Sequence, residues 1–171
     1  MKRVAVLMGG PSAEREVSLV SGRECAKGLQ EAGYDAYTID VGHDVKALVA
    51  ALEPRPDAVF NALHGRFGED GCVQGVLEFL SIPYTHSGLL ASALAMDKPM
   101  AKRVFTAAGI RCPDGVVTDI YTAERADPVP RPYVLKPANE GSNHALRTHR
   151  LRMDRHQANA TQQAAGRPSG K

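Results

Sequence analysis

The sequence predicts an α/β fold whose N-terminal part is a Rossmann-like parallel sheet. Three short runs, at residues 3–8, 34–40 and 57–62, are rich in apolar and β-branched residues, and segments with helical spacing separate them. This alternation of strands and helices is typical of a doubly wound parallel sheet. Ligands of such sheets bind beyond the carboxyl ends of the strands, so the loops that follow the strands are the candidate site.

The other elements are predicted from turn residues and apolar periodicity. Residues 9–11 (Gly-Gly-Pro) end the first strand, and Ser12 is the expected cap of a helix that stops at Gly33. Its expected apolar face is Val17, Val20, Cys25, Leu29 and Ala32. The later elements are expected as helices at 45–52 and 71–80, an extended segment at 82–84, a helix from a Ser87 cap to 95, a helix from Pro99 to about 109, and strands near 116–117 and 133–135.

Composition and charge divide the chain into three predicted parts. We expect an N-terminal domain at 1–96, the beginning of a second domain at 97–142, and a basic tail at 143–171. The first two parts carry 15 Lys and Arg against 18 Asp and Glu, a net charge of −3, whereas the tail carries 6 against 1, a net charge of +5. The tail contains no Val, Ile, Phe, Tyr or Trp, which predicts disorder, because it cannot bury enough apolar surface to fold.

Cysteine usage and hydropathy exclude several classes of protein. The three cysteines are widely spaced and form no CxxC, so they indicate neither a disulfide framework nor a zinc site, and they favour a reducing, cytoplasmic compartment. No apolar run is long enough to span a membrane, and the first residues lead directly into a strand rather than a signal-peptide core. The tail lacks the interleaved aromatic residues of a nucleic-acid-binding arm.

The candidate site centres on residues 61–71, NALHGRFGEDG. A buried strand opens here into a polar loop that places a His, an Arg, a Glu and an Asp within seven positions, and its three glycines let backbone amides approach a ligand closely. The alternative is a solvated strand-to-helix turn. The turn at 9–11 lacks GxGxxG spacing, which disfavours dinucleotide binding, although amides at a helix N-terminus could still bind an anion.

Five blocks of sequence resemble the D-alanine–D-alanine ligases of the ATP-grasp superfamily. They are GGPSAEREVSL (9–19), ALHGRFGEDG (62–71), IPYTHSG (82–88), SALAMDK (92–98) and VLKPANEGS (134–142). Their order and spacing match the family over residues 3–142. The resemblance implies an N-terminal ligase domain followed by the start of an ATP-grasp domain.

The resemblance also implies an activity. ATP phosphorylates the carboxylate of one D-alanine, and the amine of a second D-alanine attacks the acyl phosphate, giving a dipeptide for peptidoglycan synthesis and so for cell wall and cell shape. The implied cofactors are ATP and Mg²⁺, the implied location is the cytoplasm, and a homodimer is a possible assembly. The resemblance implies binding neither to nucleic acid nor to a membrane.

Family roles map onto six residues of this chain. Glu14 and Ser142 match the catalytic pair that holds the ammonium of the first D-alanine, and His64 matches a histidine near its carboxylate. Without that match, Glu14 complements a helix dipole and His64 is a solvated loop residue. Lys98, Lys136 and Gly141 match positions that contact the ATP phosphates, although Lys98 beside Asp97 also suits a surface ion pair. No metal ligand maps onto the chain.

The sequence departs from the family pattern after Ser142. Related ligases continue roughly as GSSVGV, whereas this chain reads GSNHALRTHR; a second departure is His86 in place of a glycine. The change predicts a frameshifted or prematurely ended frame and an inactive fragment. The alternatives are a small-anion-binding Rossmann-like module without catalysis and an interaction protein with a basic tail.

Overall fold

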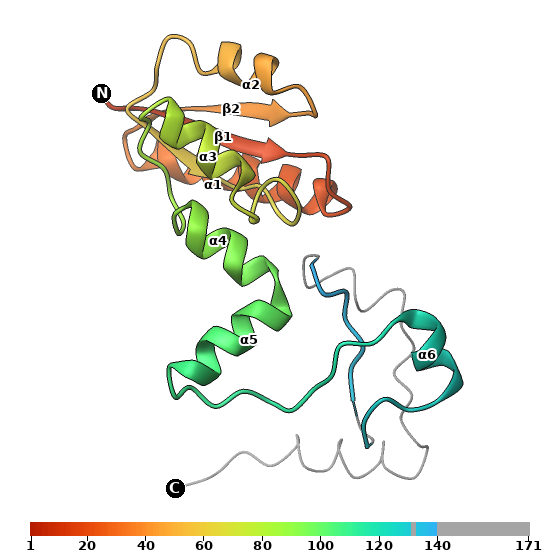
Figure 1. The fold of residues 1–171 in the computed structure, drawn as a ribbon. Coiled ribbons are helices and arrows are strands. Elements are labelled where there is room, and N and C mark those ends of the chain that lie inside the picture. The colour runs from red at the N-terminus through yellow and green to blue at the C-terminus, as the bar shows by residue number, and fades with distance from the viewer. Residues whose placement is uncertain (131–132, 140–171) are drawn as a thin grey trace, which may run out of the picture.

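The α/β fold predicted from sequence is present in the computed structural model, which describes residues 1–130 and 133–139. Three parallel strands form a sheet in the order β2-β1-β3 (Figure 1). Their bounds are Arg3–Gly9 for β1, Asp35–Val41 for β2 and Ala58–Asn61 for β3. The carboxyl ends of all three strands therefore lie at one edge of the sheet.

The central strand, β1, is buried on both faces. Its residues from Val4 to Leu7 expose 7% or less of their surface. Ala5 and Leu7 belong to one apolar cluster, whereas Val6 belongs to another on the opposite face. Successive side chains of a strand point to opposite faces, so a continuous apolar run is what a strand covered on both sides requires.

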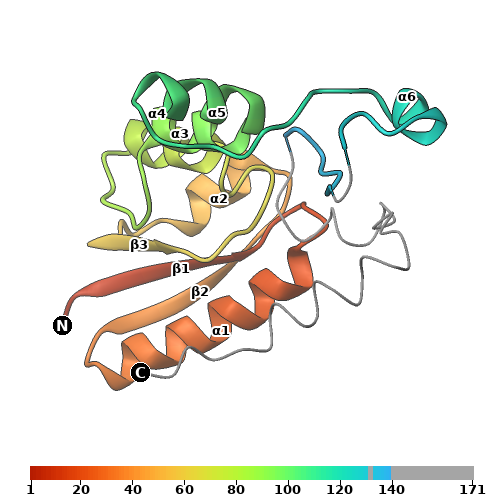
Figure 2. The same cartoon turned by 90° about the horizontal axis from the view of Figure 1, so that it is seen from below.

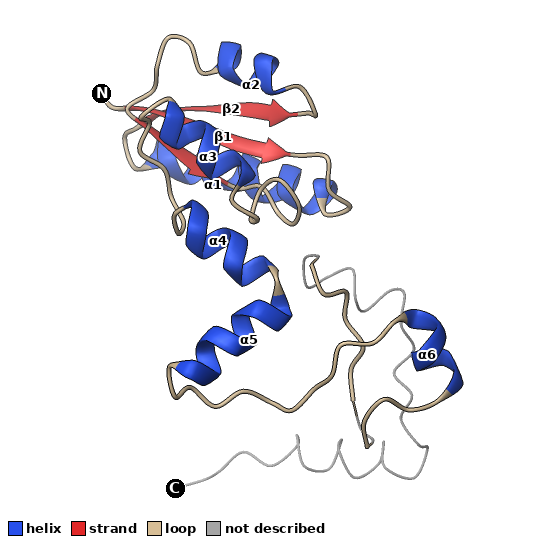
Figure 3. Cartoon of the chain, in the orientation of Figure 1, coloured by secondary structure: helices blue, strands red, loops and turns tan. Residues whose placement is uncertain are grey.

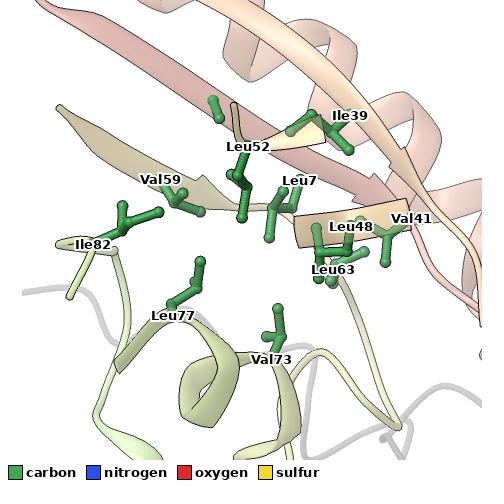
Figure 4. Close-up of a cluster of buried hydrophobic side chains, with 11 residues drawn as sticks. Leu7, Ile39, Val41, Leu48, Leu52, Val59, Leu63, Val73, Leu77 and Ile82 are labelled. Carbon is green, nitrogen blue, oxygen red and sulfur yellow. The ribbon is translucent and has the colours of Figure 1, made fainter. Parts of the chain in front are cut away.

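Helices cover the two faces of the sheet unequally. Helix α1 (Arg15–Glu31) lies on one face, and α2 (Val45–Ala51) and α3 (Cys72–Phe79) lie on the other (Figure 2). The larger core lies between the sheet and the face covered by α2 and α3, where Leu7 and Val59 meet Val73 and Leu77 (Figure 4). A segment after α3 adds one parallel bridge, between Tyr84 and Val59, to the outer edge of β3.

Helix α1 packs on the sheet mainly through small residues, and of its predicted apolar face Cys25 and Leu29 also pack against the core. Ser18, Gly22 and Ala26 are its buried positions, whereas Val17 and Val20 are 49% and 55% exposed. A Cβ on Gly22 would lie 2.3 Å from Cβ of Met8, so the helix backbone lies directly on β1. The predicted face was therefore wrong at Val17 and Val20, because close approach to the sheet favours small residues over large apolar ones.

Three further helices follow the sheet. They are α4 (Leu89–Met96), α5 (Lys98–Ala107) and α6 (Ile120–Arg125) (Figure 3). Asp97, in extended conformation, separates α4 from α5, and its carboxylate caps α5 by accepting a hydrogen bond from the amide of Met100 at 2.9 Å. The break coincides with the domain boundary that the sequence predicts, and the division into domains at 1–96 and 97–142 stays a prediction.

Several local predictions were wrong. Ser12 does not cap α1, which begins three residues later, and Ser87 does not cap α4, whose cap position is Gly88. The Ser12 hydroxyl instead donates to the backbone carbonyl of His64. At the start of α4 the bond runs the other way, because the Ser92 hydroxyl donates to the backbone carbonyl of Ser87. No strand is present at 116–117 or 133–135, where no described segment pairs with the extended backbone. The predicted disorder of 143–171 lies outside the described residues.

No helix in the described parts of the chain is both long and apolar enough to cross a membrane. Cys25, Cys72 and Cys112 are all free thiols.

Candidate functional site

Two loops meet at the carboxyl edge of the sheet, as the sequence predicted. The first follows β1 at residues 10–14, and the second follows β3 at residues 62–71. The Ser12 hydroxyl joins them by donating to the carbonyl of His64 at 2.7 Å. The Ser18 hydroxyl, buried in α1, donates to the carbonyl of Ala62 at 2.7 Å, which fixes the start of the second loop on the helix.

A cavity of about 760 Å³ opens between these loops and the junction of α4 with α5. Residues 137–139 close its far side. The charged side chains that line it are Glu14, Arg66, Asp70 and Asp97. A cleft at strand ends with a few charged side chains in its lining is the place where an open α/β sheet binds ligands.

Buried amides hold the second loop in shape. The side-chain amides of Asn61 and Gln74, each 1% exposed or less, both donate to the carbonyl of Gly68 at 2.9 Å. The Oδ1 atom of Asn61 also accepts from the amide of Leu63 at 3.1 Å. These buried donors fix the backbone of the loop at Gly68, although the Oε1 atom of Gln74 is buried without a hydrogen-bond partner among the described residues.

Two acidic residues of this loop bind its own backbone. Glu69 accepts from the amide of Gly65 at 2.6 Å, and Asp70 accepts from the amides of Phe67 at 2.9 Å and Cys72 at 3.1 Å. These carboxylates are therefore structural. Asp97, which also lines the cavity, caps α5 in the same way. The other two charged side chains of the lining, Glu14 and Arg66, are not engaged with backbone amides.

Glu14 is held against the loop with its carboxylate unpaired. Within residues 1–130 and 133–139 its side-chain oxygens make no hydrogen bond or ion pair, although the residue is half-buried. The Oε2 atom lies so close to Gly65 that a Cβ there would be 2.6 Å away. Gly65 has φ of 68°, so both its conformation and its contact with Glu14 favour glycine.

Arg66 supplies a cation to the same cavity. Its guanidinium lies over the ring of Phe67, 5.1 Å from the centroid. In the described part of the chain it forms no ion pair. The sequence places this arginine in the polar loop at 61–71, but the family resemblance implies a substrate-binding role for His64 and none for Arg66.

His64 does not line the cavity. Its Nε2 atom lies 3.4 Å from the hydroxyl of Ser21 on α1, and the residue is half-buried. The structure thus brings the backbone of His64 to the junction of the loops, whereas its ring contacts the helix. The expected position beside a substrate carboxylate is not tested by these contacts and stays a prediction.

The lysines expected to bind phosphate lie on two adjoining segments. Lys98 begins α5, and its amide donates to the carbonyl of Ala138 at 3.1 Å, which places the segment carrying Lys136 beside α5. Lys98 is half-buried and Lys136 is exposed. Gly141 and Ser142 lie outside the described residues.

An ion pair braces the first loop. Arg15 donates to both carboxylate oxygens of Asp40, at 2.8 and 2.7 Å, which ties the start of α1 to the end of β2. The hydrogen bond to Asp40 raises the pKa of Arg15 above its ordinary value. Gly9 packs beneath this pair, where a Cβ would lie 2.2 Å from Oδ1 of Asp40.

The residues described contain no group of three or more His, Cys, Asp or Glu side chains placed to hold a metal ion.

Cys72 should react slowly with thiol reagents although the residue is exposed. Partial burial raises the pKa of its thiol, and the hydrogen bond and negative charge of Asp70 raise it further. A raised pKa means less thiolate at a given pH, so alkylation should be slower than that of an ordinary thiol and rise only at higher pH. The measurement is the pH profile of iodoacetamide labelling at Cys72 by mass spectrometry. Asp70→Asn should shift the profile to lower pH, and an unshifted profile would contradict the assignment to Asp70.

Comparison with known proteins finds relatives for most of this chain. Residues 45–87 match the family model described as the D-ala D-ala ligase N-terminus. A D-alanine–D-alanine ligase from Acidiphilium cryptum is 62% identical over 143 residues, which are 84% of this chain and 48% of the relative. The chain thus spans about half the length of the curated relatives it matches.

Solved structures agree with the sequence relatives. The ligase of Bacillus anthracis superposes with a TM-score of 0.70 at 29% identity, over 96% of this chain and 54% of that one. A structure of the ligase from the same organism complexed with ATP superposes with a TM-score of 0.59 at 38% identity, over 67% of this chain and 39% of that one. By sequence and by fold, this chain belongs to the D-alanine–D-alanine ligase family and corresponds to its N-terminal portion.

Proposed function

We propose that this chain provides the first-substrate side, and part of the phosphate side, of an ATP-dependent D-alanine–D-alanine ligase. The observation that supports this most directly is the unpaired carboxylate of Glu14 at the cavity between the two strand-end loops. A half-buried carboxylate without a partner is suited to bind a cation, and the ammonium of an amino acid is such a cation.

Glu14 would orient the first D-alanine by accepting hydrogen bonds from its ammonium. Ser142 would contribute a hydroxyl to the same ammonium, as the family resemblance implies. The loop at 64–70 forms one wall of the cavity, and its carboxylates already bind backbone amides. The substrate would therefore meet a fixed surface, which reduces the entropic cost of orienting it.

His64 would act beside this site rather than within its lining. Its carbonyl accepts from Ser12, and its ring lies against Ser21. We propose that the imidazole contributes to the potential near the substrate carboxylate across the loop. Its replacement should then affect binding less than replacement of Glu14.

Lys98 and Lys136 would hold the phosphates of ATP, with the backbone of Gly141 beside them. The hydrogen bond between Lys98 and Ala138 supports this, because it brings together the two segments that carry these cations. When bound, ATP would supply the phosphoryl group that turns the substrate carboxylate into an acyl phosphate. The lysines would neutralise negative charge on the phosphates. No step is assigned to Mg²⁺, because no group of three or more His, Cys, Asp or Glu side chains among the described residues is placed to hold a metal ion.

The biological setting follows from this activity. The dipeptide would enter peptidoglycan precursor synthesis, and ATP dependence favours a cytoplasmic location. A homodimer is the assembly we propose from the family.

The test is a titration of the 171-residue chain with D-alanine, followed by amide NMR shifts. We expect shifts around residues 12–14 and 64–70. Glu14→Gln should weaken binding by about tenfold or more, because it removes a charge-assisted hydrogen bond. Glu16→Gln is the matched control, since Glu16 lies exposed in the first turn of the same helix. Unchanged affinity in Glu14→Gln, or no D-alanine-induced shift in the parent chain, would contradict the proposal.

A further inference from the structure

Two opposite charges line the cavity without pairing with each other. Glu14 and Arg66 both face it, yet no ion pair joins them. We infer that Arg66 binds the carboxylate of the amino acid whose ammonium is held by Glu14, so that the cavity selects a zwitterion. This inference rests on the proposed function and deepens it, because it assigns a specificity-determining residue.

Gly65 brings Glu14 next to the segment that carries Arg66. The Glu14 carboxylate packs against this glycine, since a Cβ there would lie 2.6 Å from Oε2. Arg66 is the next residue, and consecutive Cα atoms are about 3.8 Å apart. A ligand that contacts the Glu14 carboxylate therefore lies next to the backbone from which the Arg66 side chain extends.

The Arg66 guanidinium stacks on the neighbouring aromatic ring. It lies over Phe67, 5.1 Å from the ring centroid. The backbone of Phe67 is held by its amide, which donates to Asp70 at 2.9 Å, and its ring makes an edge contact with His43, with the centroids 6.2 Å apart. Stacking on an aromatic face leaves the edge of a guanidinium free to donate to a carboxylate.

The other charges around the cavity are already engaged or directed elsewhere. Asp70 accepts from two backbone amides, and Asp97 caps α5. The ring of His64 lies against Ser21 instead of the cavity. Lys98 and Lys136 are not among the residues that line it. Among the described residues, Arg66 is thus the cation that lines this cavity.

Guanidinium and carboxylate form two parallel hydrogen bonds, and this geometry specifies the ligand as well as attracting it. An analogue without the negative charge, such as D-alaninamide, retains the ammonium for Glu14 but cannot form the charged pair with Arg66. The two ends of the ligand can therefore be tested separately.

The experiment measures the affinity of the 171-residue chain for D-alanine and D-alaninamide by NMR titration. Arg66→Gln should weaken D-alanine binding by about tenfold to a hundredfold and leave the D-alaninamide affinity unchanged. Arg66→Lys should restore part of the loss. Glu14→Gln should weaken binding of both ligands. Arg23→Gln, an exposed arginine of α1, is the charge-matched control and should change neither affinity.

The outcomes separate this inference from the proposed function. If the parent chain binds D-alanine through Glu14 but Arg66→Gln binds it equally well, the inference is overturned and the proposed function stands. An equal loss for both ligands in Arg66→Gln would also overturn it, because it indicates damage to the loop, which the amide spectrum of the variant would reveal. If the parent chain does not bind D-alanine, the proposed function itself fails and this inference fails with it.

Discussion

Replacement of Gly65 by alanine should weaken D-alanine binding by at least about a hundredfold. The new Cβ would lie 2.6 Å from Oε2 of Glu14 and 3.3 Å from Ser12, so the carboxylate or the loop must move. Gly65 also precedes Arg66 and donates its amide to Glu69. One substitution thus displaces both proposed substrate contacts, and a displacement of about 1 Å at such a site can cost on the order of a hundredfold.

Gly33→Ala is the matched control for this prediction. Gly33 has φ of 88°, similar to the 68° of Gly65, but a Cβ there meets no atom within 4 Å. Both substitutions impose left-handed backbone strain of roughly 1 kcal/mol or more on stability. Only Gly65→Ala should change the affinity measured by D-alanine titration. A similar affinity in the two variants would show that the contact with Glu14 does not matter for binding.

Leu77→Ala should lower the free energy of unfolding by about 2–5 kcal/mol, the range for emptying a well-packed leucine site. Leu77 is fully buried where α3 meets the sheet, facing Leu7 and Val59 (Figure 4). The measurement is equilibrium unfolding in urea followed by circular dichroism. A loss of this size is a large part of the stability of an ordinary domain.

Phe79→Ala on the same helix is the control for Leu77→Ala. Phe79 is 95% exposed, so its replacement should change the free energy of unfolding by no more than about 0.5 kcal/mol. If Phe79→Ala proved as destabilising as Leu77→Ala, another surface would have to cover Phe79 in solution, and the burial described for α3 would be incomplete.

The central strand and the candidate loops were predictable from sequence. A continuous apolar run predicts a strand buried on both faces, and β1 has Val4 to Leu7 at 7% exposure or less. Parallel strands share the edge at which their carboxyl ends lie, so the loops after β1 and β3 had to meet. The hydrogen bond from Ser12 to His64 is the contact that joins them.

The contact face of α1 was not predictable from apolar periodicity. Val17 and Val20 favoured one face, whereas the helix lies on the sheet through Ser18, Gly22 and Ala26. Hydrophobic patterns record which residues avoid water, but not how closely two backbones approach. At Gly22 the distance to Met8 decides the packing, and that distance depends on the tertiary structure.

The predicted cap at Ser12 was wrong, and the role that we propose for Arg66 was not predicted from the sequence. A serine before a helix resembles an N-cap, but a carbonyl from a residue 52 positions away takes its hydroxyl. Arg66 was visible as a charge in a polar loop, yet only the stacking on Phe67 and the lining of the cavity distinguish it from a solvated side chain. The contact between Ser12 and His64 and the lining of the cavity both depend on the tertiary structure and leave no local signal in the sequence.

The hydrogen bond from Lys98 to Ala138 has a consequence for amide exchange. The amides of β1 lie between two neighbouring strands and should exchange only when the whole sheet unfolds. The Lys98 amide, by contrast, joins segment 137–139 to α5 at the far side of the cavity, where local opening can expose it without disturbing the sheet. The wall of the cavity formed by 137–139 would then open and close with its own, smaller free energy, and a ligand bound to both walls should slow exchange at Lys98 far more than in β1.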